Sequence, residues 1–364
     1  MPKQKNRDLS LDFLKGLAIL LVVFFHNIQL NPASIADNLF MLAGGAAVPC
    51  FFLVSGALFF RQSFSMEKHI RRMLRFYLVM VAWRAIYLGL YHAWGTPLPG
   101  SMRPLLSYLF LFQSLDGVET SHFWFMDAML TVMLIAPLLK VCMDEHRKLV
   151  YYLMALLFLF NQLVADGNLL FALIARMTGK GAWDISAFAE ISPFSFRYSN
   201  YMLYYLLGGL LMEHREKASK KTSCLMMAAG LCGLVLIKYL QSGTIRWQGL
   251  HITSAYYWIS TMALACGMFL FATNNLRRWL CPACRVNPDR FCPLVWFANT
   301  VGSSTLGIFY LHIPLIFILR PGLFEPLASY NGWMLNLAES LLIVGIACVI
   351  IWIGRKIPVI KHLF

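Results

Sequence analysis

An apolar segment near the N-terminus, residues 9–30, carries Lys15 and His26 eleven residues apart. About 20 apolar residues are long enough to cross a bilayer as a helix. An ionisable side chain inside such a helix costs about 2.5–3.5 kcal/mol on insertion scales, so it needs a specific environment. At about 100° per residue, eleven residues make roughly three turns, which places both side chains on one face about 16 Å apart along the axis. Asp8 and Asp12 continue this face, and we expect the charged stripe to face protein or a water-filled cavity.

The composition is that of a membrane protein. Charged residues make up only 13% of the 364 residues and hydrophobic residues 59%, whereas soluble domains carry about 25% charged residues. The sequence therefore predicts an all-α, polytopic integral membrane protein with about ten transmembrane helices. The predicted spans are residues 9–30, 41–60, 76–94, 122–140, 149–165, 198–213, 223–240, 253–274, 294–318 and 334–353.

The basic residues between these spans predict the topology. With the N-terminus inside, 22 of the 31 lysines and arginines lie in cytoplasmic segments, six lie outside, and three lie within or at the ends of spans. Such a bias over short loops favours an N-in, C-in arrangement. It also accounts for the net charge of +14 without a nucleic-acid partner. Two further features are a half-helix expected at 105–115 and an outer loop, 166–197, expected to cap a cavity. With no internal repeat, one domain is predicted over residues 1–364.

Five segments carry motif residues at fixed spacings. They are LDFLKGLAILLVVFFH with Lys15 and His26, VPCFFLVSG ending at Ser55 and Gly56, RRMLRFY with Arg72 and Arg75, FWFMDAML with Trp124 and Phe125 followed by APLL with Pro137, and SSTLGIFYLH with Ser303, Gly307, Tyr310 and His312. In this order, the set resembles the acyltransferase-3 family of integral membrane acyltransferases. Lys15 stands where arginine is commoner in that family. The chain resembles the stand-alone type, which has no appended esterase-like domain.

The resemblance implies an O-acetyltransferase. Such an enzyme moves an acetyl (acyl) group from acetyl-CoA to a hydroxyl of a surface polysaccharide or a lipid-linked sugar, in a bacterial plasma (inner) membrane that the chain crosses many times. His26 is the expected general base, since imidazole titrates near neutrality. The other site residues implied are Lys15 and His312 for catalysis, Arg71, Arg72 and Arg75 for the CoA phosphates, and Asp12, Trp124 and Tyr310 for substrate.

Each of these residues also has a simpler interpretation. His26 could hydrogen-bond a neighbouring helix, Lys15 could extend to the membrane interface, and the arginines could serve topology alone. A transporter of a small solute or a glycan precursor is the alternative function, and a non-catalytic membrane sensor is a third class. Cys281, Cys284 and Cys292 resemble half a zinc site that lacks a fourth ligand, so no metal is expected.

The topology is the first testable prediction. Cysteine-accessibility labelling should find the 61–75 and 275–293 segments on the cytoplasmic face, because the 22-to-6 charge split retains basic loops inside. The measurement compares intact cells with opened cells. Labelling of either segment from outside intact cells would contradict the ten-span arrangement.

Overall fold

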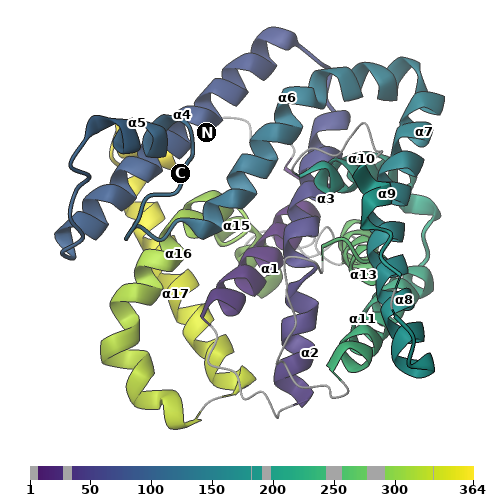
Figure 1. The fold of residues 1–364 in the computed structure, drawn as a ribbon. Coiled ribbons are helices and arrows are strands. Elements are labelled where there is room, and N and C mark those ends of the chain that lie inside the picture. Colours follow the sequence, from purple (N-terminus) through teal and green to yellow (C-terminus); the bar gives the residue numbers. More distant parts are fainter. Residues whose placement is uncertain are drawn as a thin grey trace. The chain divides into compact units, whose positions relative to one another are not determined.

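A computed structural model describes residues 7–27, 35–181, 183–190, 198–242, 256–276, 292–330 and 332–364 (Figure 1). The secondary structure in these ranges is helical, apart from turns and one isolated β-bridge between Leu115 and Val118. This confirms the predicted all-α class. The chain divides into a larger compact unit, Met1–Arg61 with Lys148–Ile353, and a smaller one, Gln62–Arg147 with Gly354–Phe364. The single domain over 1–364 stays a prediction.

The larger unit contains most of the helices. They are α1 (Leu9–His26), α2 (Ile35–Gly44), α3 (Ala47–Phe60), α7 (Arg147–Leu157), α8 (Val164–Thr178), α9 (Ser186–Glu190), α10 (Ser199–His214), α11 (Lys220–Ser242), α13 (Ile259–Leu270), α15 (Pro293–Thr300), α16 (Thr305–Leu319) and α17 (Trp333–Gly354). Short π and 3-10 turns join or extend them: η2 (Phe158–Leu163), η3 (Arg215–Lys217), η4 (Phe271–Leu276), η5 (Arg320–Phe324) and η6 (Glu325–Tyr330).

The smaller unit contains α4 (Met66–Ala93), α5 (Met102–Phe110), η1 (Ser121–Phe123), α6 (Trp124–Glu145) and η7 (Ile360–Leu363). Arg84 of α4 is buried and donates hydrogen bonds to the carbonyls of Tyr108, Phe112 and Gln113. Its guanidinium also lies 5.2 Å from the centre of the Tyr108 ring. Since these carbonyls lie in the last turn of α5 and just after it, Arg84 fixes this short helix against α4. The half-helix predicted at 105–115 is thus present in part, because α5 begins at Met102 and ends at Phe110.

Nine helical segments among the described residues are long and apolar enough to cross a bilayer. They are Leu9–His26, Ala36–Phe60, Met66–Ala93, Ser121–Glu145, Arg147–Ala175, Lys220–Tyr239, Ile259–Leu276, Thr305–Leu327 and Trp333–Gly354, so the chain is a polytopic membrane protein. The predicted span that is not among these nine, 198–213, is α10. At 16 residues it is about 24 Å long, shorter than a hydrocarbon core of about 30 Å. The orientation of the termini stays a prediction.

Several predicted segment boundaries are wrong. Helix α4 begins at Met66, ten residues before the predicted span 76–94, and the predicted span 41–60 is interrupted between α2 and α3. The span predicted at 294–318 is two helices, because α15 ends at Thr300 and α16 begins at Thr305. The break falls at Gly302, Ser303 and Ser304, where small polar residues replace the apolar pattern. The outer loop predicted at 166–197 begins inside a helix, since α8 continues to Thr178. Asp166 is accommodated there because it accepts a hydrogen bond from the backbone N–H of Ile259 at 3.0 Å.

Glycines allow α3 and α10 to pack closely. A Cβ at Gly56 of α3 would overlap the backbone carbonyl of Tyr205, and a Cβ at Gly208 of α10 would overlap the carbonyl of Leu53. Small residues at a helix crossing let the backbones approach, which stabilises association inside a membrane. This close crossing explains why α10 is buried along most of its length.

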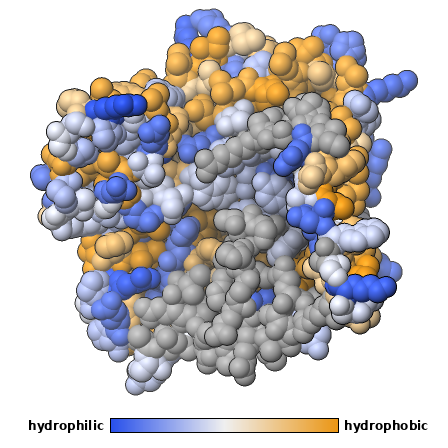
Figure 2. All heavy atoms as spheres, in the orientation of Figure 1, coloured by the Kyte–Doolittle hydropathy of each residue, from blue (hydrophilic) through white to orange (hydrophobic). Residues whose placement is uncertain are grey.

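Large apolar side chains also cover the outside of the helices. Leu134 and Leu138 of α6, and Val349 and Trp352 of α17, are all more than half exposed. Figure 2 shows apolar residues over much of the visible described surface. In water such an exterior would be an association site, whereas in a bilayer it is the surface that contacts lipid.

The glycine crossing predicts a difference between two substitutions. Gly56→Ala should destabilise the larger unit by about 1–3 kcal/mol, because the added methyl meets backbone that has no room to move. Gly345→Ala in α17 is the matched control, since nothing lies within 4 Å of its Cβ position. It should be neutral or slightly stabilising. Thermal unfolding in detergent measures both, and equal melting temperatures for the two variants would refute the packing argument.

Candidate active site

The charged stripe of α1 begins with Asp12, which is buried and holds two cations. Its carboxylate accepts from the Arg7 guanidinium at 2.7 Å and from Lys15 Nζ at 2.7 Å. The Lys15 pair spans three residues of the helix, so both side chains lie on one face. The Lys15 side chain is 22% exposed. Lys15 is therefore paired with a carboxylate of its own helix.

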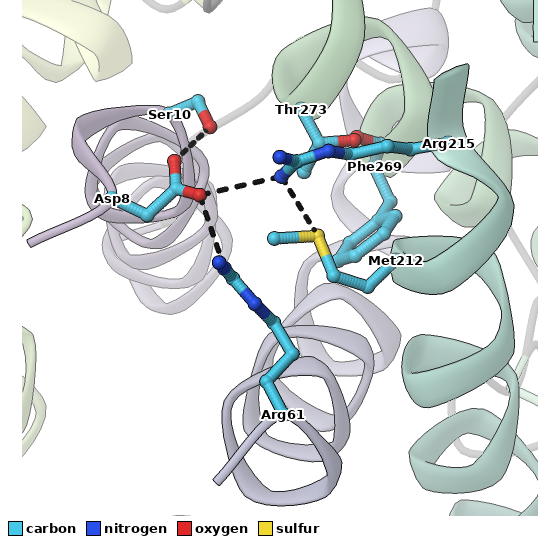
Figure 3. A network of polar contacts seen from close by, with 7 residues as sticks. All are labelled: Asp8, Ser10, Arg61, Met212, Arg215, Phe269 and Thr273. Atoms are coloured by element: carbon cyan, nitrogen blue, oxygen red, sulfur yellow. Dashed lines mark hydrogen bonds and ion pairs between the residues drawn. The ribbon is translucent and has the colours of Figure 1, made fainter.

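Asp8, just before α1, connects three elements of the larger unit (Figure 3). One of its oxygens accepts from Arg61 at the end of α3 at 3.3 Å and from Arg215 of η3 at 3.4 Å. Arg215 is buried and also contacts Met212 Sδ at 3.2 Å. Ser10 donates to the other Asp8 oxygen. The N-terminal end of α1 is thus tied to α3 and η3 by charge-assisted hydrogen bonds.

The break between α15 and α16 lies against the same part of α1. A Cβ at Gly302 would overlap the backbone carbonyl of Asp12, and one at Gly16 would lie 2.7 Å from the Phe297 ring. Phe297 and Phe13 of α1 also pack with ring centres 5.3 Å apart. Helix α15 therefore packs directly beside the Asp12–Lys15 pair, and α16 continues from there toward His312.

Two histidines meet at the other end of α1. His26, the last residue of α1, and His312 of α16 have ring centres 5.1 Å apart, although 286 positions separate them in sequence. His312 is fully buried, and its Nδ1 lies 2.6 Å from the Phe309 carbonyl. Because a carbonyl only accepts, Nδ1 carries the proton, and Nε2 of a neutral His312 is then an acceptor. His26 is only partly buried, so it is the more accessible of the two rings.

A buried carboxylate lies at the same end of α1. Asn27, which directly follows His26, donates from Nδ2 to Glu339 Oε2 of α17 at 2.7 Å. Both side chains are nearly inaccessible, with 0% of Asn27 and 4% of Glu339 exposed. Arg320 of η5 interacts electrostatically with Glu339. The C-terminal end of α1 therefore gathers two imidazoles, an amide and a carboxylate from three helices.

The remaining predicted residues lie as follows. Tyr310 is fully buried in α16, in the larger unit. The other four belong to the smaller unit. Trp124 begins α6 and is half-buried, and the three arginines are exposed on α4. Arg71 pairs with Glu67 at 2.5 Å, and Arg72 reaches Gln62 at 3.4 Å. The structure thus brings His26 and His312 together, and Lys15 and Asp12 together. The roles of all these residues stay predictions.

The sequence interpretation missed several polar contacts within the protein. Arg61 and Arg215 count among the basic residues that predict the topology, yet both pair with Asp8. Glu339 gave a usable signal, since it is the single carboxylate in an otherwise apolar helix. In the smaller unit, His122 is buried and lies 3.1 Å from the Tyr87 hydroxyl. Its sequence signal was weaker, because His122 lies at the first residue of the predicted span 122–140 and outside the motif FWFMDAML.

Within the described ranges, no group of three or more His, Cys, Asp or Glu residues is arranged to hold a metal ion. Cys281 and Cys284 lie outside those ranges, so the predicted cysteine cluster has no structural description.

These elements define a polytopic membrane protein whose first helix carries a charged stripe ending at a histidine pair. The family model of an acyltransferase domain matches residues 8–355, nearly the whole chain. The chain therefore belongs to the acyltransferase-3 family. Comparisons with curated proteins and with solved structures give no significant match.

The Asp12–Lys15 pair generates a prediction about charge. Lys15→Arg should retain acyl transfer, because arginine keeps the cation beside Asp12, and Lys15→Met should lose most of it. Loss of folding is not expected, since Arg7 still pairs with Asp12. Acetylation of surface glycans at matched protein abundance is the measurement, and exposed Lys221→Met is the control. Equal activity of the Lys15 variants would show that the charge at this position has no part in the reaction.

Proposed function

We propose that this acyltransferase moves an acetyl group from acetyl-CoA to a hydroxyl of a surface polysaccharide or a lipid-linked sugar in a bacterial plasma membrane. The family makes the chain an acyltransferase of the membrane. The observation that carries the finer proposal is the histidine pair, with ring centres 5.1 Å apart at the end of a helix that is otherwise apolar there. Two imidazoles so close disfavour a doubly protonated pair, so at least one ring is neutral and able to accept a proton.

His26 is the better candidate for the general base. His312 is fully buried and its Nδ1 is occupied by the Phe309 carbonyl, whereas His26 is partly accessible to an incoming hydroxyl. His312 then stays neutral, so that only one of the two imidazoles is charged when His26 holds the proton. Asn27, bonded to Glu339, holds the chain directly after His26, which restricts the movement of the end of α1.

The reaction needs one base and one leaving group. As the acceptor oxygen attacks the thioester carbonyl, His26 takes the hydroxyl proton, and a C–O bond forms. The C–S bond then breaks, and the CoA sulfur leaves and accepts the proton from the imidazolium. Acyl transfer at a site away from bulk water also limits loss of the thioester to hydrolysis.

Arg72 and Arg75 are proposed to hold the phosphates of CoA. Both are exposed on α4, and guanidinium groups bind phosphate through two parallel hydrogen bonds. Arg71 is the weaker candidate, because Glu67 already pairs with it. Asp12, Trp124 and Tyr310 are proposed to bind substrate, and Lys15 to supply a charge on the face of α1 that carries Asp12. Lipid contacts the exposed apolar faces of the helices.

Substitution of His26 tests the proposal. His26→Gln keeps hydrogen bonding and similar size but accepts no proton near neutrality, so acyl transfer should fall about 10²–10⁴-fold. Binding of acetyl-CoA to the purified variant should persist, because the proposal assigns the phosphates to arginines of α4. Acetate released from surface glycans by mild alkali is the readout.

Exposed His362→Gln is the matched control and should acetylate like the wild type. Wild-type acetylation by His26→Gln would refute the assignment of His26 as the base. Loss of acetyl-CoA binding together with transfer would indicate a structural role instead.

A further inference from the structure

Glu339 is the one carboxylate, and the one side chain that is charged near neutral pH, in the apolar sequence of α17. Charged groups inside membrane helices are costly and mark functional contacts unless they are fully paired within the protein. Glu339 is 4% exposed, so water does not solvate it freely. The carboxylate therefore needs partners, and the number of its hydrogen bonds determines what else it binds.

One half of this carboxylate has a partner and the other half has none among the described residues. Oε2 accepts from Asn27 Nδ2 at 2.7 Å. Oε1 is buried and has no hydrogen-bond partner in the described part of the chain, and the same holds for Asn27 Oδ1. Arg320 contributes a nearby positive charge but no hydrogen bond to Glu339 among those residues. Two buried acceptor oxygens, from side chains that contact each other, thus lack a hydrogen-bond donor among the described residues.

The position of these oxygens indicates the kind of donor. Asn27 follows His26 directly, and His26 lies against His312. A ligand that brings one hydroxyl to His26 and carries further hydroxyls would present them at the same end of α1. Carboxylate and amide oxygens are the acceptors that bind sugar hydroxyls, and a hydrogen bond to a charged oxygen is stronger than one to a neutral oxygen.

We propose that Glu339 Oε1 and Asn27 Oδ1 bind neighbouring hydroxyls of the acyl acceptor, which is therefore a polyol with hydroxyls beside the one that is acylated. This inference rests on the proposed function and adds the substrate contact. Arg320 offsets the charge of Glu339, so the subsite does not require a cationic acceptor. An acceptor with a single hydroxyl would leave both oxygens without a donor.

Glu339→Gln is the sharpest test, because it keeps the size of the side chain and an oxygen that can accept from Asn27. Glycan acetate released by mild alkali should fall at least tenfold in cells producing the variant at wild-type abundance. The affinity of the purified variant for acetyl-CoA should stay within about twofold of wild type, and its melting temperature should be unchanged. Glu339→Asp keeps the charge and should recover part of the transfer. Exposed Glu325→Gln is the matched control.

The possible outcomes distinguish failure of this inference from failure of the proposed function. Full acetylation by Glu339→Gln, while His26→Gln has lost it, would overturn the role of Glu339 and leave the function standing. A lowered melting temperature, or weaker acetyl-CoA binding in parallel with the loss of transfer, would mean that Glu339 only fastens α17 to α1. If the proposed function itself is wrong, cells that produce the wild-type chain should release no more glycan acetate than cells that lack it.

Discussion

The organisation of the larger unit depends on how the charges of α1 are compensated inside an apolar environment. Asp8 and Asp12 are matched by four basic side chains, Arg7, Lys15, Arg61 and Arg215. Removing one member of a buried pair typically costs about 3–5 kcal/mol, because the remaining charge stays desolvated. This applies best to Arg215, whereas the pairs of Arg7 and Arg61, which are nearly half exposed, contribute less because water screens them. The N-terminal end of α1 is therefore tied to α3 and η3, and the direction of α1 fixes where its last residue, His26, lies.

The other end of α1 is organised by polar contacts with the C-terminal helices. His26 meets His312 of α16, and Asn27 bonds Glu339 of α17. The break after α15 allows this arrangement, since Gly302 lets the turn approach the backbone of α1 and α16 starts anew beyond it. One helix thus connects an ionic cluster to a pair of histidines. This is the arrangement we propose an acyltransferase uses to activate a hydroxyl.

Sequence reasoning predicted the helical class, the membrane setting, the family and most of the span positions, because each depends on composition or on spacing along one helix. The Lys15–Asp12 contact was also within reach, since it joins residues three apart. Contacts that join distant helices were not predictable in the same way. The pairing of Arg215 with Asp8 and of Asn27 with Glu339 depends on the packing of helices whose order in space the apolar pattern does not specify. The extension of α8 past Asp166 was not predictable in this way either, because the hydrogen bond that accommodates this carboxylate comes from the distant backbone of Ile259.

Acyl transfer by the purified protein is the most direct test of the central claim. The full chain in lipid vesicles would be given acetyl-CoA labelled in its acetyl group, together with surface glycans or lipid-linked sugars from cells that lack the protein. We expect the label to appear in the glycan as base-labile acetate, with one CoA thiol released for each acetate transferred. Label that stays with the donor, while an unmodified solute crosses the vesicle membrane, would contradict the account and favour a transporter.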